Sequence, residues 1–260
     1  MVTSEALTPY HPEGLTAEQE HLIDTLFTTE ITAPVGKIRF PPPDNKPEYY
    51  KVERLTTPIA FAQFIDEFAL VGHREEIKRG EELSPLSPIY INLRGLPRGV
   101  YNEIGLVLSQ IELPTKPDFC VGIPEAGLPI MRAFSKYSGI PPYIDFLQKV
   151  QTDEGETKII VREGIEGRGE KVLLIDDVVT HADTKLQAAR AMKERKFKVI
   201  GFAVACDREQ GAREQLESLG YGLYAATRIR QILKNGLRTG KGGLTRERYE
   251  QVMDYLGFAI

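Results

Sequence analysis

The chain has 260 residues, with 33 Lys and Arg against 37 Asp and Glu, and a net charge of −4. This slightly acidic balance disfavours a nucleic-acid-binding surface, and the 42% hydrophobic content is typical of a globular protein. No run of 18 apolar residues and no basic start before an apolar core is present, so we expect no membrane span, no signal peptide and a cytoplasmic location. Cys120 and Cys206 lie in apolar runs, which predicts buried free thiols.

The first 60 residues are predicted to form an added N-terminal piece. Residues 16–27 have apolar side chains at helical spacing, with Thr16 as the N-cap and Gln19 completing a capping box. The proline cluster at residues 41–43 predicts an irregular connection. A second apolar stripe at helical spacing predicts a helix over residues 58–70.

The next elements are predicted to begin a sheet. Residues 87–94 alternate in a strand-like way and predict an edge strand. Residues 119–123 predict the first strand of a parallel sheet, followed by a turn at 124–129 and a helix to about Tyr137. Gly127 in this turn would permit close approach of backbone N–H groups to an anion.

A strand and a long loop are predicted to follow. Residues 142–150 predict the strand, and residues 151–170 predict a polar loop that contains four glycines. A loop of this length inside a compact sheet is usually functional or mobile.

The most informative stretch is residues 171–185. Its apolar run, Val172–Ile175, ends in Asp176 and Asp177 before a turn and a helix-compatible segment at 184–197. Open α/β sheets bind ligands where a buried strand ends and a helix begins. Adjacent carboxylates accept hydrogen bonds from vicinal hydroxyls, and a helix N-terminus holds phosphate. Two ribose hydroxyls and a 5-phosphate fit both requirements.

The remaining segments continue the alternation of strands and helices. Residues 198–205 predict a buried strand that ends in Cys-Asp-Arg-Glu-Gln-Gly at residues 206–211. After it we predict a helix at 212–219, a strand at 220–226, and closing helices at 227–233 and 244–256 separated by a basic loop at 234–243.

Residues 172–184 resemble the phosphoribosyl pyrophosphate (PRPP) signature of type I phosphoribosyltransferases, in which an apolar strand and an acidic pair precede a phosphate loop. Two positions depart from it: Ala182 replaces the usual Gly, and Asp183 replaces Ser or Thr. A carboxylate about 4 Å from a phosphate charge costs on the order of 4 kcal/mol at an effective dielectric of 20. Asp183 is therefore interpreted as an N-cap or first-turn residue that favours the helix dipole, and His181 as an exposed loop residue.

Five segments occur in the order of the orotate branch of that family: a Ser-Pro-x-Tyr segment at 87–90, the 124–128 turn, the 151–170 loop, the acidic pair, and Asp-Arg-x-x-Gly at 207–211. In that branch the turn holds pyrophosphate and the arginine contacts the orotate carboxylate. Three further positions depart from the pattern: Glu82 and Thr152 replace lysines, and Glu154 replaces a histidine.

The resemblance implies an α/β protein with the type I phosphoribosyltransferase fold, a Rossmann-like, mostly parallel sheet flanked by helices. It divides the chain into an N-terminal extension at 1–80, a core at 81–235 and a C-terminal helix at 236–260. It implies transfer of ribose 5-phosphate from PRPP to orotate with Mg²⁺ as cofactor, in a homodimer. The site residues that it implies are Lys149, Asp176 and Asp177 for catalysis, and Tyr90, Ile91, Glu125, Ala126, Gly127, Thr180, His181, Ala182, Asp183, Thr184 and Arg208 for substrates, with no metal ligand from the chain.

Other interpretations remain open. The altered loops favour a protein that keeps the fold but serves as a PRPP or nucleotide sensor, because acids stand where the family has cations or neutral donors. A phosphoacceptor domain would need its acceptor Asp at a later strand end, and Asp207 is a poor candidate because the acidic pair belongs to another strand. A dinucleotide-binding unit is weaker still, since no Gly-x-Gly-x-x-Gly follows a strand.

Overall fold

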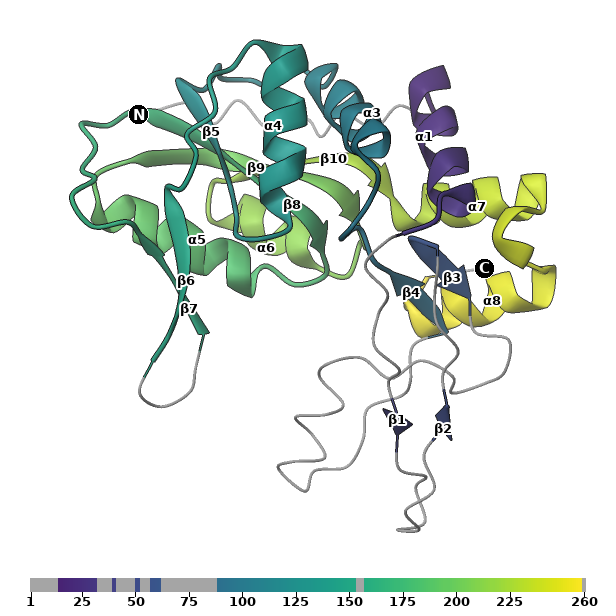
Figure 1. Cartoon of the computed structure of the whole chain (residues 1–260). Coiled ribbons are helices and arrows are strands. Elements are labelled where there is room, and N and C mark those ends of the chain that lie inside the picture. The colour runs from purple at the N-terminus through teal and green to yellow at the C-terminus, as the bar shows by residue number, and fades with distance from the viewer. Residues whose placement is uncertain are drawn as a thin grey trace.

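A four-stranded parallel sheet forms the centre of the computed structural model, which describes residues 14–31, 39–40, 50–51, 57–61, 88–152 and 157–258 (Figure 1). The strand order is β10-β9-β8-β5. These strands are β5 (Phe119–Gly122), β8 (Lys171–Val179), β9 (Lys198–Asp207) and β10 (Gly222–Arg228). The predicted parallel sheet is confirmed, and so is the α/β fold class.

Helices cover both faces of this sheet (Figure 1). They are α3 (Arg98–Ser109) and α4 (Gly127–Ser138) on one face, and α5 (Asp183–Glu194) and α6 (Ala212–Ser218) on the other. Successive strand residues point to opposite faces, so Leu173 and Ile175 join the core under α3 and α4, whereas Val172 and Leu174 join the core under α5.

Helix α3 was not predicted from the sequence, although its pattern is a clear one. Val100, Ile104, Val107 and Leu108 recur at helical spacing and are buried. The helix packs closely on α4, because a Cβ at Gly105 would lie 2.6 Å from the Cβ of Ala133. It therefore forms part of the layer that covers one face of β8.

The N-terminal helix α1 (Ala17–Thr28) confirms the predicted capping box. The Gln19 backbone N–H donates to the Thr16 hydroxyl at 3.2 Å, and the Thr16 N–H donates to the Gln19 side chain at 3.1 Å. Leu22, Ile23 and Leu26 are buried in the same core as residues of α3 and α7 (Ile229–Thr239). The helix is thus packed into the main body of the protein.

The helix predicted over residues 58–70 is wrong at its start. Residues Ile59–Phe61 form strand β3, which pairs antiparallel with β4 (Ile89–Ile91), and residues 62–70 lie outside the described part. The edge strand predicted at 87–94 supplies the partner for β3, and this pairing overrides the local helical spacing. A further short antiparallel pair joins β1 (Arg39–Phe40) and β2 (Tyr50–Lys51).

The segment after α4 also differs from the prediction. The strand predicted at 142–150 begins later, as β6 (Leu147–Gln151), and it pairs antiparallel with β7 (Thr157–Val161) instead of joining the main sheet. The loop predicted at 151–170 therefore contains a strand. Ile159 and Val161 are buried in the core under α5 and hold the hairpin against the body of the protein.

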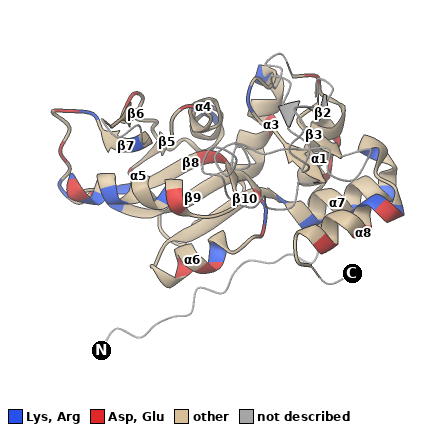
Figure 2. Cartoon of the chain, turned by 90° about the horizontal axis from the view of Figure 1, so that it is seen from below, with Lys and Arg blue, Asp and Glu red and all other residues tan. Residues whose placement is uncertain are grey.

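The prediction of a basic loop at 234–243 is also largely wrong, because most of this segment is helical. Helix α7 continues to Thr239, because Asn235 and Gly236 are buried on its inner face, and a short 3-10 turn, η1 (Lys241–Gly243), leads to α8 (Arg246–Tyr255). Basic and acidic residues are interspersed along α5 and α8, whereas the charged residues of α7 are all basic (Figure 2). In the part of the chain that the structure describes, no helix is long and apolar enough to cross a membrane.

Candidate active site

The two carboxylates at the end of β8 lie in different surroundings. Strand alternation directs Asp176 toward the face covered by α5, where Lys185 Nζ lies 2.7 Å from its Oδ2. Asp177 points toward the other face, where Tyr101 of α3 and Arg94 are close enough to interact with its charge. The sequence placed the two carboxylates side by side, whereas the sheet separates them.

Burial raises the pKa of Asp177, and the neighbouring charge of Asp176 raises it further. The Val178 backbone N–H, which donates to Asp177 Oδ1 at 2.7 Å, acts in the opposite direction, as do Lys185 and Arg94. Asp177 is thus a partly desolvated carboxyl group at a strand end, where a ligand hydroxyl can donate to it.

The predicted phosphate loop joins β8 to α5. Ala182 is the N-cap residue of α5 and is fully buried, and its φ of −87° does not require a glycine. Its backbone N–H donates to the Gln215 side chain of α6 at 3.2 Å. Asp183 opens the helix as a first-turn residue, as predicted. The loop residues that face outward are His181, Asp183 and Thr184, while Thr180 is half-buried.

The predicted pyrophosphate turn lies against β8. The Ile123 backbone N–H donates to the Ile175 carbonyl at 2.8 Å, and a Cβ at Gly127 would collide with that same carbonyl oxygen. Gly127 therefore permits the close contact between this turn and the strand, in addition to the approach to an anion that the sequence predicts. Glu125 is exposed and Ala126 is half-buried beside it.

Strand β9 ends beside β8 in the Asp-Arg-x-x-Gly run. The Arg208 backbone N–H donates to the Val179 carbonyl at 2.9 Å, so the two strand ends are joined directly. Arg208 is 9% exposed, and burial lowers its pKa. Its Nε has no hydrogen-bond partner among the described residues. The neighbouring aromatic side chain is Tyr255 of α8.

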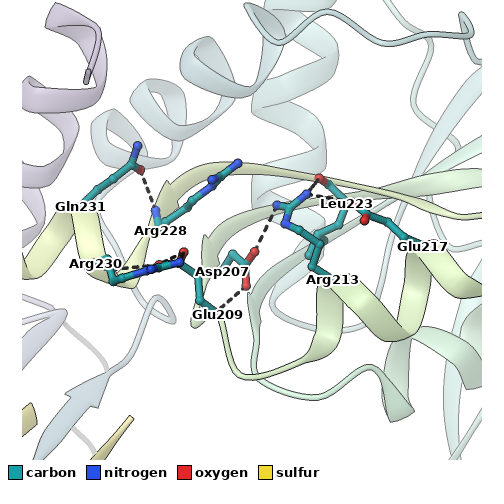
Figure 3. Close-up of polar contacts among 8 residues, drawn as sticks. All are labelled: Asp207, Glu209, Arg213, Glu217, Leu223, Arg228, Arg230 and Gln231. Atoms are coloured by element: carbon teal, nitrogen blue, oxygen red, sulfur yellow. Dashed lines mark hydrogen bonds and ion pairs between the residues drawn. The ribbon is translucent and has the colours of Figure 1, made fainter. Parts of the chain in front are cut away.

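Ion pairs hold the rest of this run (Figure 3). Arg213 Nη2 lies 3.2 Å from Asp207 Oδ2, and the Glu209 backbone N–H donates to Asp207 Oδ1 at 2.8 Å. Arg230 donates twice to Glu209 Oε1, through Nη2 at 2.7 Å and Nε at 3.0 Å. These contacts fix the residues on both sides of Arg208 and leave its guanidinium group out of the network.

Two residues near the site were missed from sequence. Arg94 follows β4 and interacts electrostatically with both Asp177 and Tyr90. Tyr101 donates its hydroxyl to the Leu93 carbonyl at 3.0 Å, which ties α3 to the same loop. Only the pairing of distant segments brings these side chains to β8, so no local pattern could have identified them.

The other predicted residues are less closely tied to the acidic pair. Tyr90 and Ile91 are half-buried on β4, and burial raises the pKa of Tyr90. Lys149 is exposed on the β6–β7 hairpin, which packs on α5 through β7 and extends away from the main sheet (Figure 1). Thr152 is half-buried at the end of β6, while Glu82 and Glu154 lie outside the described residues.

Comparison with known proteins shows which family this chain belongs to. The phosphoribosyl transferase domain model matches residues 99–219. An orotate phosphoribosyltransferase of Aquifex aeolicus (strain VF5) is 31% identical over 156 residues, which cover 57% of this chain and 82% of that relative. The chain therefore belongs to the phosphoribosyltransferase family. Within that family, its sequence is similar to the orotate phosphoribosyltransferases.

Two solved structures have a similar fold. A UMP synthase of Leishmania donovani has a TM-score of 0.58 at 25% identity, over 77% of this chain and 39% of that one. The orotate phosphoribosyltransferase of Mycobacterium tuberculosis H37Rv has a TM-score of 0.51 at 16% identity, over 84% of this chain and 99% of that one. This chain thus spans well under half of the UMP synthase but nearly all of the second protein.

Proposed function

We propose that the protein transfers ribose 5-phosphate from PRPP to orotate, giving orotidine 5′-monophosphate and pyrophosphate. The observation that carries this proposal is Arg208, a buried guanidinium group whose Nε has no partner among the described residues, beside the strand that ends in the acidic pair. A guanidinium group pairs geometrically with a carboxylate, and orotate carries one. The similarity to orotate phosphoribosyltransferases supports the same substrate.

PRPP would bind along the ends of β5 and β8. Its ribose hydroxyls would donate to the acidic pair, with Asp177 the more accessible acceptor. Its 5-phosphate would lie on the loop of residues 180–184, at the N-terminus of α5. Its pyrophosphate would lie on the 124–128 turn, where Glu125, Ala126 and Gly127 would contact it.

Orotate would lie on the β4 side of the crevice, against Tyr90 and Ile91, with hydrogen bonds to Thr180 and Arg208. Orotate N1 loses its proton to solvent and forms the new bond to ribose C1 as the bond from C1 to the pyrophosphate oxygen breaks. Charge develops on the leaving pyrophosphate, and a cation stabilises it in the transition state. Lys149 would be that cation when the β6–β7 hairpin closes over the site.

Mg²⁺ would enter with the substrate. No group of three or more potential metal ligands lies together in the described residues, and Mg²⁺ is commonly held by substrate phosphates with few protein ligands. The ion would neutralise charge on the pyrophosphate. A homodimer is part of the same proposal, since in this family the hairpin loop commonly reaches the partner's site.

A second candidate is a PRPP or nucleotide sensor without turnover, and the phosphate loop favours it. Asp183 places a negative charge in the first turn of α5, where a 5-phosphate would bind. The Ala182 N–H already donates to Gln215, so it is engaged without a ligand. Both features weaken phosphate binding relative to an open loop of neutral donors.

The test is the loss of orotate ultraviolet absorbance on mixing protein, PRPP, Mg²⁺ and orotate. We expect turnover by the wild-type protein and loss of at least about 10²-fold in kcat/KM for Asp177→Asn, which keeps the shape but removes the charge. Absence of wild-type turnover, with PRPP binding retained in calorimetry, would support the sensor instead.

A further inference from the structure

One buried lysine, directly after the PRPP-like motif, has no role in the proposed chemistry. Lys185 lies in the first turn of α5, and its side chain is 6% exposed. Lysine is almost never fully buried unless its charge is paired. This lysine donates to the Val178 carbonyl at 2.6 Å and lies 2.7 Å from Asp176 Oδ2. Both partners belong to the end of β8.

These contacts join the helix to the strand across the phosphate loop. Residues 180–184 lie between the end of β8 and the first turn of α5, so the lysine links the two segments that flank the phosphate loop. It holds Asp176 toward α5, and it holds the backbone at Val178, whose own N–H donates to Asp177 Oδ1. The orientation of Asp177 therefore depends on a peptide segment that Lys185 anchors.

Burying the Lys185–Asp176 ion pair has a large desolvation cost. The Asp176 side chain is 9% exposed, so both charges have lost most of their hydration. Removing one partner of such a buried pair leaves an uncompensated charge, which must be protonated, rehydrated or moved. Any of these responses would displace the strand end on which the loop is built.

We propose that Lys185 is a positioning residue for PRPP, which acts through Asp176 and the Val178 carbonyl to hold the acidic pair and the phosphate loop in their binding geometry. This inference rests on the proposed function. It separates the roles of the two acids: Asp177 faces the ligand, while Asp176 is fixed from behind by the helix. The family resemblance assigned no role to this lysine.

A double-mutant cycle on the full-length protein tests the proposal, using steady-state kinetics with PRPP and orotate. The variants are Lys185→Met, Asp176→Asn and the double variant, with Lys193→Met as an exposed control on the same helix. We expect Lys185→Met to raise KM for PRPP by about tenfold or more, with a change in kcat of less than about threefold. The control should stay within about twofold of wild type.

In the Asp176→Asn background we expect Lys185→Met to change KM for PRPP by less than about threefold, because the charge on which it acts is gone. The double variant also replaces the ion pair with two neutral side chains, so it stays measurable if Lys185→Met alone fails to fold. Equal effects in both backgrounds, or an unchanged KM with only a lower melting temperature, would overturn the proposal. A wild-type protein that neither turns over nor binds PRPP would instead refute the proposed function, and this inference with it.

Discussion

Arg208 is a side chain whose burial has a physical cost in the ligand-free protein. Its pKa is lowered by burial, and its Nε lacks a partner among the described residues, while the acids on either side of it are paired with Arg213 and Arg230. Leaving a buried donor unpaired costs about 1–3 kcal/mol. A ligand carboxylate that accepts from this group would remove the cost, so the arginine should contribute to orotate affinity.

Replacing Arg208 with lysine keeps the charge but removes the planar fork. We expect Arg208→Lys to raise KM for orotate by about 10–100-fold, with KM for PRPP within about twofold of wild type. Steady-state kinetics with each substrate varied in turn measures both constants. Arg132→Lys, on the exposed side of α4, is the matched control. An equal rise in both KM values would place Arg208 in a general structural role.

The raised pKa of Asp177 predicts a pH dependence of stability and of binding. Because the folded-state pKa lies above the ordinary value, the protonated form is favoured in the fold, and its contribution to stability is full below the ordinary aspartate range. That contribution is lost as pH rises through the folded pKa. The Asp177→Asn variant should therefore gain stability relative to wild type as pH rises, measured by urea unfolding at several pH values.

PRPP binding should have the opposite dependence, because only the ionised carboxylate is a full acceptor for ribose hydroxyls. We expect kcat/KM for PRPP to fall with decreasing pH at a higher pH than an ordinary aspartate would give. A pH profile that is flat through the weakly acidic range would contradict this expectation.

At the scale of an element, the β6–β7 hairpin separates two candidate cations. Lys149 pairs across the hairpin with Ile159, and Lys158 pairs with Val150. Paired residues share a face and neighbours alternate, so the two lysines lie on opposite faces. Ile159 is buried, so Lys149 lies on the face that turns toward the core. Only one of the lysines can approach a given substrate.

We expect Lys149→Ala to lower kcat by about 10²–10³-fold, the loss typical of removing one charge-stabilising donor. Lys158→Ala is the matched control on the opposite face and should change kcat by less than about threefold. Both lysines are exposed, so the free energy of unfolding should change by less than about 0.5 kcal/mol in either variant. A larger effect of Lys158→Ala would assign the catalytic face to the other side of the hairpin.

At the scale of the whole molecule, α1 is part of the main core despite its place in the predicted N-terminal extension. Its Gln19 side chain donates to the Ala226 carbonyl of β10 at 3.1 Å, and Asp24 accepts from Asn235 of α7 at 2.9 Å. Asp24 also lies 2.6 Å from Lys241 Nζ. The boundary at residue 80 stays a prediction, but the helix before it is held by contacts with the far end of the chain.

Leu22 is fully buried where α1 meets this core. We expect Leu22→Ala to lower the free energy of unfolding by about 2–5 kcal/mol, because the truncation leaves a cavity. Glu18→Ala, exposed on the same helix, should change it by less than about 0.5 kcal/mol. Denaturant unfolding measures both. A small effect at Leu22 would mean that α1 detaches without disturbing the sheet.

Local patterns predicted the central strands, α1 and the order of the site motifs. Val172–Ile175 is apolar throughout because β8 is buried on both faces, and that signal is present in four adjacent residues. Parallel strands end at one edge of a sheet, so the sequence alone predicts that motifs at successive strand ends belong to one site.

The short strand β3 and the contacts of Arg94 and Lys185 with the acidic pair were decided only by the tertiary structure, because they depend on contacts between residues far apart in the chain. The strand β3 pairs with β4, which lies about 30 residues later in the chain, and Arg94, which follows β4, interacts with Asp177 at the end of β8. The pairing of Lys185 with Asp176 could not be predicted from the sequence either. A lysine in the first turn of a helix is ordinarily expected to be solvated, and only the packing of α5 on β8 buries this one beside a carboxylate.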